Sequence, residues 1–106
     1  MSETIRTLLE ELRNGLAAIY GPRLAGLYLF GSYARQEPQA DSDVDVLVVL
    51  DRLDGYSSEL ERTGQLVSDL SLKYGVSISR VLTSQQAWAQ PQTPFLTAVG
   101  QEAVAV

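Results

Sequence analysis

Asp43 and Asp45 stand one residue apart at the start of an apolar run that continues from Val46 to Leu50. Residues two apart in a strand point to the same face, so the two carboxylates are expected side by side. Adjacent carboxylates repel each other, and burial raises that cost unless a cation lies between them. The chain has no histidine and no cysteine, and oxygen ligands alone suit Mg²⁺ first and Mn²⁺ second. The spacing therefore predicts a site for a hard divalent cation.

A glycine–serine pair, Gly31-Ser32, ends the preceding aliphatic run, and ten residues separate it from Asp43. Glycine at the end of a strand lets a phosphate approach the backbone, where exposed N–H groups and the Ser32 hydroxyl can donate hydrogen bonds. A phosphate-binding turn beside a carboxylate pair that holds magnesium describes a nucleoside triphosphate site.

Each of these features also has a plain structural interpretation. A glycine and a serine after a strand usually form only a turn, and the acidic residues from Asp41 to Asp45 are also typical of a solvated loop. A calcium-binding loop is excluded, because Val46 stands where it needs glycine and Arg52 where it needs glutamate. The glycine-rich motifs G-x-x-x-x-G-K-S/T and G-x-G-x-x-G are absent. The prediction depends on the combination of strand, Gly-Ser, fixed gap, Asp-x-Asp and strand.

The composition limits the class of protein. With 106 residues, of which 45% are hydrophobic and 20% charged, the chain is expected to form a single domain over 1–106. The absence of histidine removes imidazole as a general base, and the absence of cysteine excludes disulfides. A formal net charge of −5 disfavours direct binding of nucleic acid. No apolar run reaches the length of a membrane span, so we expect a cytoplasmic protein without membrane contact.

An α/β pattern surrounds the candidate site. The segment 44–50 is apolar on both faces, which predicts a central strand that is covered on both sides. Ser58 and Glu61 predict a capping box in the second long helix, and Thr93-Pro94 predicts an N-cap followed by proline in the last helix. We expect helices at 3–20, 33–36, 56–74 and 95–99, strands at 24–30, 44–50 and 76–82, and an apolar tail at 103–106.

The gap of ten residues between Gly31-Ser32 and Asp43-Val44-Asp45 resembles the signature of the polymerase-beta-like nucleotidyltransferases. Within that superfamily the chain resembles the minimal nucleotidyltransferases, short stand-alone domains that are often encoded beside a helical HEPN partner as toxin–antitoxin pairs. The likeness covers nearly the whole chain: the leading helix, "LFGSYAR", "SDVDVLVVL", the helix at 56–74 and the ending "TPFLTAVGQEAVAV".

The resemblance implies a fold and a mechanism. The fold would be a short mixed β-sheet with helices packed mainly on one face. Asp43 and Asp45 would be catalytic and would hold two Mg²⁺ ions around a nucleoside triphosphate, whose terminal phosphates Gly31 and Ser32 would bind. A substrate hydroxyl would attack the α-phosphorus and release pyrophosphate. Arg35 matches the family's usual arginine and could reach phosphate, although a plain ion pair with Glu37 fits it equally well.

Two departures from the family's pattern bear on activity. Active members carry a third carboxylate on the next strand, which helps to deprotonate the attacking hydroxyl. Here alternation puts Ser77 and Ser79 on one face, and no acid occurs between Asp69 and Glu102. Losing such a group typically costs about 10²- to 10⁴-fold in rate. In addition, Gln36 stands where the family often has glycine, which restricts the backbone of the turn.

Two functions of different classes follow. The first is an Mg²⁺-dependent nucleotidyltransferase that moves AMP from ATP, or uses another nucleoside triphosphate, onto a hydroxyl of a partner protein such as a HEPN toxin, and so acts as an antitoxin. The acidic surface favours a protein or small molecule as acceptor. The second is a catalytically impaired nucleotide-binding or antitoxin interaction module, whose surface Trp88, Phe95 and the apolar tail could supply, although both aromatics are expected in the core. A homo-oligomer is compatible with either function.

Overall fold

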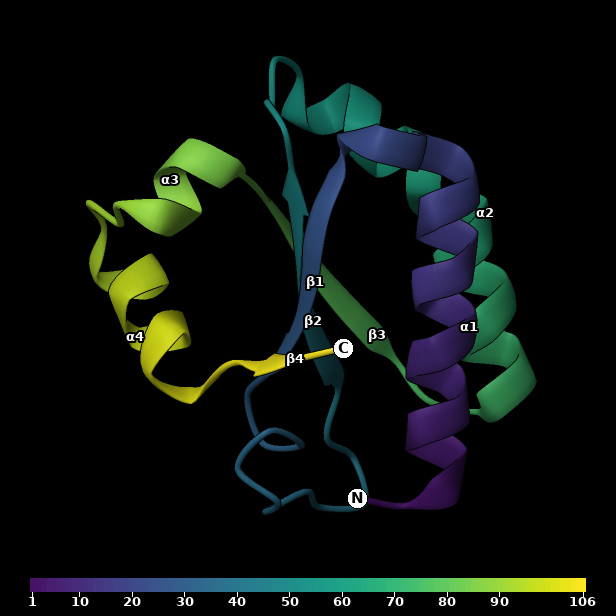
Figure 1. The fold of residues 1–106 in the computed structure, drawn as a ribbon. Helices are drawn as coiled ribbons and strands as arrows, with labels where there is room; N and C mark the ends of the chain where they lie inside the picture. The colour runs from purple at the N-terminus through teal and green to yellow at the C-terminus, as the bar shows by residue number, and fades with distance from the viewer.

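The computed structural model describes residues 1–106, and its four strands form one mixed sheet in the order β3-β2-β1-β4 (Figure 1). β1 (Leu24–Phe30) pairs antiparallel with β2 (Val44–Leu50) on one side and with the two-residue β4 (Val104–Ala105) on the other. β2 also pairs in parallel with β3 (Ile78–Ser84). β1 and β2 are the two inner strands. Because they are antiparallel, the end of β1 is level with the start of β2, where the candidate residues lie.

Helices cover both faces of this sheet. The long α1 (Glu3–Tyr20) and α2 (Tyr56–Tyr74) lie on one face, and the shorter α3 (Gln85–Ala89) and α4 (Pro94–Glu102) lie on the other (Figure 1). A single 3-10 turn, η1 (Gly21–Arg23), connects α1 to β1. The predicted α/β fold is confirmed, with most of the helical residues on one face. No helix combines the length and the apolar character needed to cross a membrane.

Strand β2 is buried on both faces, as its apolar sequence predicts. Alternate residues from Val44 to Leu50 pack with α1 and α2, whereas Leu47 and Val49 pack with Leu96 on α4. From Val46 onward and at Val44, these side chains are at most 1% exposed. Full burial of a valine or leucine contributes about 1.5 to 3 kcal/mol, so β2 anchors the sheet.

Helix α1 buries the apolar stripe that its spacing predicts. The Ser2 hydroxyl caps the helix by accepting the N–H of Ile5 at 3.2 Å. Tyr20 takes the last buried position of the helix, and Ile19 is only partly buried. The other buried residues of the stripe are Ile5, Leu8, Leu9, Leu12 and Leu16.

Two local predictions are wrong. Residues 33–36 form hydrogen-bonded turns instead of a short helix, because Gln36 adopts a left-handed φ of 59° that a right-handed helix does not allow. The capping box at Ser58 and Glu61 is also absent. Helix α2 begins at Tyr56 with Gly55 as its N-cap, no side chain caps it, and Ser58 already lies inside the first turn.

Two element boundaries and one burial prediction also differ. β3 begins and ends two residues later than expected, because its pairing runs level with β2 from Val44 to Leu50. α4 continues to Glu102, although Thr93 is its N-cap as predicted. Phe95, expected in the core, is 46% exposed and meets Phe30 edge to face.

A buried carboxylate, Glu59, joins α2 to the end of α1. It is only 6% exposed, and it accepts hydrogen bonds from the Tyr20 hydroxyl at 3.2 Å and from Nη2 of Arg23 at 3.0 Å. Nε of Arg62 lies 3.1 Å from Oε1, the oxygen that also accepts the Tyr20 hydroxyl. A buried carboxylate needs such partners because an uncompensated charge is costly away from water. This network therefore holds the two long helices against η1.

Replacement of Glu59 by glutamine should destabilise the fold. The amide keeps the shape but removes the charge that compensates two arginines, so we expect the free energy of unfolding to fall by about 2 kcal/mol. Glu61→Gln, at an exposed position of the same helix, should change it by less than about 0.5 kcal/mol. Urea denaturation compares the two variants, and equal effects would exclude a structural role for the Glu59 network.

Candidate active site

Asp43 and Asp45 lie at the start of β2, next to the end of β1. Asp45 is opposite Phe30 in the antiparallel ladder and beside Ser79 in the parallel one. Asp43 precedes the strand and is exposed, whereas Asp45 is partly buried. The alternation along β2 puts both on the face that carries Leu47. The structure thus brings the two predicted carboxylates together, and their charges interact.

Gly31 allows the chain to turn directly against Asp45. Its φ of +76° lies in the left-handed region that residues with a side chain rarely adopt. A Cβ at this position would also overlap the carboxylate of Asp45. Both the backbone angle and the available space therefore require glycine, and the turn that begins here lies directly against the Asp45 side chain.

The turn that follows Gly31 presents two further predicted residues, Ser32 and Arg35. The N–H of Arg35 donates to the Gly31 carbonyl at 3.1 Å, and the N–H of Glu37 donates to the Ser32 carbonyl at 2.9 Å. Ser32 is partly exposed and Arg35 is exposed. Gln36 is the one non-glycine residue with positive φ, a conformation that costs an L-residue about 1 to 2 kcal/mol. The position where the family often has glycine therefore has the backbone that glycine favours.

One residue of this site, Glu102 at the end of α4, is missing from the sequence prediction. Its Oε2 accepts a hydrogen bond from the N–H of Gly31, and its two oxygens lie 3.1 and 3.2 Å from Nη1 of Arg35. The ion pair expected between Arg35 and Glu37 is longer, at 3.9 Å. The apolar tail contains the signal that could have located Glu102. When the tail is placed antiparallel to β1, Glu102 lies level with Gly31.

The surroundings of Asp45 disfavour its charged form. Burial is the main reason that the pKa of Asp45 lies above its ordinary value, and the charge of Asp43 raises this pKa further. Arg35 opposes the shift, and Glu102 adds to it. At neutral pH the ionised pair is therefore held together at a cost to stability. A divalent cation between Asp43 and Asp45 would remove that cost.

The donor set fits a magnesium ion that binds together with a nucleotide. Asp43 and Asp45 offer only carboxylate oxygens, and Mg²⁺ is usually held by one or two carboxylates while waters and substrate phosphates complete its coordination. No third carboxylate joins them to form a cluster of metal ligands. Ser77 and Ser79, both exposed, occupy the neighbouring positions in and just before β3. The third acid is therefore absent from the structure, as the sequence indicates.

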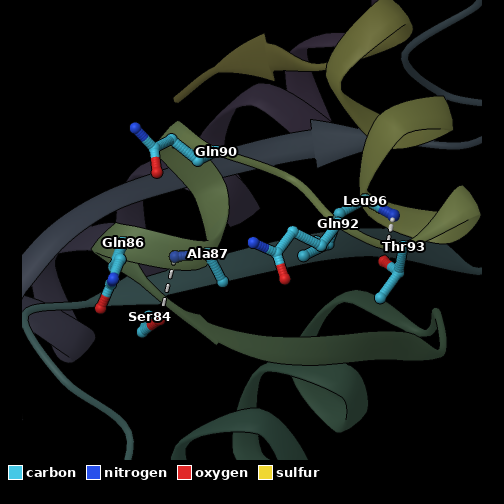
Figure 2. Close-up of a pocket in the computed structure, with 7 residues that line it drawn as sticks. All are labelled: Ser84, Gln86, Ala87, Gln90, Gln92, Thr93 and Leu96. Carbon is cyan, nitrogen blue, oxygen red and sulfur yellow. Dashed lines mark hydrogen bonds between the residues drawn. The ribbon is translucent and has the colours of Figure 1, made fainter.

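A cavity of about 270 Å³ borders Asp43 and is also lined by Tyr33 and Ser77. A second cavity, of about 310 Å³, lies between α3 and α4, where the N-cap residues Ser84 and Thr93 and three glutamines line it (Figure 2). The glutamine-lined cavity contains no titratable side chain. Of the predicted site residues, the cavity beside Asp43 is lined by Asp43 alone, and Asp45 lies outside its lining.

Comparison with known proteins agrees with this geometry. The sequence profile of the family described as nucleotidyltransferase domain matches residues 9–87. Two proteins of Methanocaldococcus jannaschii, each named as an inferred protein adenylyltransferase, are 35% and 32% identical to the chain over 78 and 75 residues. These alignments cover 74% and 71% of the chain, and 72% and 75% of the two relatives.

Solved structures of similar chains show the same fold. The structure of an inferred minimal nucleotidyltransferase is 27% identical, with a TM-score of 0.63 and coverage of 98% of this chain and 94% of the other. A toxin–antitoxin solved with AMP-PNP is 25% identical, with a TM-score of 0.60 and coverage of 91% and 70%. The resemblance to the minimal nucleotidyltransferases that the sequence shows is thereby confirmed.

Replacement of Asp45 by asparagine should stabilise the metal-free protein at neutral pH. Because the pKa of Asp45 is raised in the folded state, the fold is most stable with a neutral carboxyl and loses stability as pH rises through that pKa. We expect Asp45→Asn to raise the free energy of unfolding at neutral pH by about 0.5 to 2 kcal/mol. The gain should disappear below pH 3.8, the ordinary pKa of an aspartate, because the Asp45 carboxyl of the wild type is then as neutral as the asparagine.

Urea denaturation in EDTA, at neutral pH and near the ordinary carboxyl pKa, measures this difference. Asp41→Asn is the matched control, because Asp41 is exposed in the loop just before Asp43 and its change should leave stability nearly constant. A loss of stability in Asp45→Asn at neutral pH would show that the Asp45 charge is satisfied without a metal ion.

Proposed function

We propose a protein adenylyltransferase activity for this chain, which belongs to the family of nucleotidyltransferase domains. In this proposal residues 1–106 act as one domain that transfers the AMP group of ATP to a hydroxyl of a partner protein. The observation that carries the proposal is the contact between Gly31 and the Asp45 carboxylate, which puts a phosphate-binding turn against a carboxylate pair. The names of the two archaeal relatives support the choice of acceptor.

Asp43 and Asp45 are the residues that would hold Mg²⁺, or Mn²⁺ in its place. When bound, these ions activate the attacking hydroxyl and neutralise the charge of the leaving pyrophosphate. Because the two aspartates set the position of the metal, they also set where the phosphates of the nucleotide bind. Their ionised form is the one that binds the metal, so the raised pKa of Asp45 predicts weaker binding at acidic pH.

The turn would bind the terminal phosphates of the nucleotide. The N–H of Gly31, the Ser32 hydroxyl and the Arg35 guanidinium offer neutral and cationic donors on one side of the carboxylate pair. The oxygen of the acceptor hydroxyl forms a bond to the α-phosphorus while the bond to the bridging oxygen breaks, and pyrophosphate leaves. Neither Ser77 nor Ser79 is a base at neutral pH, so the hydroxyl proton passes to water and we expect slow turnover.

A toxin partner is the acceptor that the comparisons favour. One similar structure is a toxin–antitoxin solved with AMP-PNP, and the chain resembles minimal nucleotidyltransferases that are paired with HEPN toxins. We therefore propose that the chain acts as a cytoplasmic antitoxin that adenylylates a hydroxyl of a HEPN-domain partner. The net charge of −5 agrees with a protein rather than a nucleic acid as acceptor.

Removal of both carboxylates should abolish nucleotide binding without unfolding the protein. We expect Asp43→Asn combined with Asp45→Asn to weaken the affinity for Mg·AMP-PNP on the order of 100-fold or more, because the metal loses both of its protein ligands. Isothermal titration calorimetry of the wild type, the double variant and the control Asp54→Asn, an exposed residue beyond the other end of β2, measures the affinity. Equal binding by all three would show that the nucleotide site is wrong.

A second candidate function is a nucleotide-binding or antitoxin module with impaired catalysis. The observation that favours it is the pair of serines in the place where active members carry an acid. Both Ser77 and Ser79 are exposed, so neither is packed under a helix, and the cavity beside Asp43 includes Ser77. The acid is therefore missing from a position that has room for it.

Introduction of an acid at Ser77 separates the two functions. We expect Ser77→Asp to lose stability without metal through repulsion with Asp43, to recover it with Mg²⁺, and to transfer AMP from labelled ATP faster by about tenfold or more. Ser79→Asp, beside Asp45, is the comparison variant. Thermal unfolding with and without Mg²⁺ and transfer to a HEPN partner are the measurements. If Mg²⁺ rescues neither variant, the impaired module becomes the better account.

A further inference from the structure

We propose that Glu102 is an internal competitor for the nucleotide: its carboxylate occupies the donors of the phosphate-binding turn, and the terminal phosphate binds by displacing it. This inference rests on the proposed function, because it names the residue that controls access to that same site. Glu102 lies outside the residues 9–87 that match the family profile. It belongs instead to the ending of the chain that follows the matched residues.

The contacts of Glu102 are those that a bound phosphate would make. Oε2 accepts the N–H of Gly31, and both carboxylate oxygens lie within 3.2 Å of Nη1 of Arg35. The side chain is 28% exposed, so it is held in the turn and is still reachable from solvent. A single N–H cannot donate to the carboxylate and to a phosphate at full strength at the same time. Occupation by Glu102 and occupation by phosphate are therefore alternatives.

The position of Glu102 is set by the last strand of the sheet. β4 pairs antiparallel with β1, with Val104 opposite Leu29 and Ala105 opposite Tyr28. Continued backwards, this register places Glu102 level with Gly31, and the hydrogen bond between them extends the ladder by a side chain. On the other side, α4 is fixed because Leu96 and Val99 pack against β2. The carboxylate is thus delivered to the turn by the fold.

The charges around Glu102 make its removal depend on a cation. Its neighbour Asp45 is also negative, and the two charges interact unfavourably. Arg35 is the cation in contact with Glu102. A second carboxylate, Glu37, lies 3.9 Å from Nε of Arg35. A nucleotide without metal would add negative charge beside Asp45 and Glu102. Mg²⁺ bound by Asp43 and Asp45 would compensate the charge of the phosphates. Glu102 should therefore favour the magnesium complex of the nucleotide over the free nucleotide.

The weak attachment of the last strand makes displacement feasible. β4 contains only two residues, and beyond its two pairs it is held by the N–H of Val106, which donates to Leu27 at 2.9 Å, and by Arg13, which donates to the carbonyl of Val106. Val104 is 44% exposed. Ala103 and Val106 pack against the core but are only partly buried, so few buried contacts would be lost if this segment shifted.

The test is the affinity of three proteins for Mg·AMP-PNP, measured by calorimetry: wild type, Glu102→Gln and the control Glu37→Gln. Glutamine at 102 keeps the shape but loses the charge that holds Arg35, so the turn is free more often and binding should tighten by about tenfold. Glu37 carries the same charge beside the same arginine but makes no contact with Gly31. Glu37→Gln should therefore change the affinity by less than about twofold.

A second measurement follows the displacement directly. The chain has eight glycines, so labelling with ¹⁵N-glycine gives a simple amide spectrum in which Gly31 can be assigned. Its amide signal should move upfield in Glu102→Gln, because the bond to a charged acceptor is lost. In the wild type, addition of Mg·AMP-PNP should shift the same signal as phosphate replaces the carboxylate.

The outcomes separate this proposal from the proposed function. If Glu102→Gln binds nucleotide more weakly than the wild type or equally well, Glu102 is not a competitor. The adenylyltransferase proposal stays in place as long as binding by the wild type depends on Asp43 and Asp45. Weaker binding would make Glu102 a ligand of the metal or a positioning residue for Arg35. Equal binding by the wild type and the variant without both aspartates overturns the nucleotide site. Absence of nucleotide binding in the wild type and in Glu102→Gln overturns both.

Discussion

The close approach of the Asp45 carboxylate to the backbone at Gly31 determines where the candidate site lies. A side chain at residue 31 would fill the space that this carboxylate occupies, and the left-handed φ of Gly31 turns the chain at that point. The pairing of Phe30 with Asp45 then holds the end of β1 level with the start of β2. The turn and the carboxylate pair are neighbours for this reason, although ten residues separate them in sequence.

The site concentrates negative charge that the rest of the fold must support. The charge of Asp45 interacts with those of Asp43 and Glu102, Arg35 compensates both Asp45 and Glu102, and Gln36 adds a strained backbone angle nearby. This arrangement is tolerated because β2 is buried on both faces and paired on both edges immediately beyond Asp45. Strain at a binding site that is stabilised by a well-packed core is common where a ligand supplies the missing compensation.

The sequence predicts those helices and strands in which buried residues recur at a regular spacing. The stripe on α1 and the two-sided apolar run of β2 predict these elements to the residue, and Gly31, Asp43 and Asp45 are recognisable because their spacing is short and local. Glu102 was missed because β4 has two residues and no period, so only pairing with β1 reveals its place. Glu59 was missed because its burial depends on Tyr20 and Arg23, which lie far away in sequence.

Anomalous diffraction from crystals grown with Mn²⁺ and AMP-PNP would locate the metal ion and the phosphates relative to Asp43, Asp45 and Gly31. Mn²⁺ is a close substitute for Mg²⁺ at oxygen ligands and can be located without reference to the protein atoms. We expect an anomalous peak bound by the carboxylates of Asp43 and Asp45, with a terminal phosphate on the N–H of Gly31 and Glu102 moved away from it. A metal peak remote from these aspartates, or a phosphate bound elsewhere while Glu102 stays on Gly31, would contradict it.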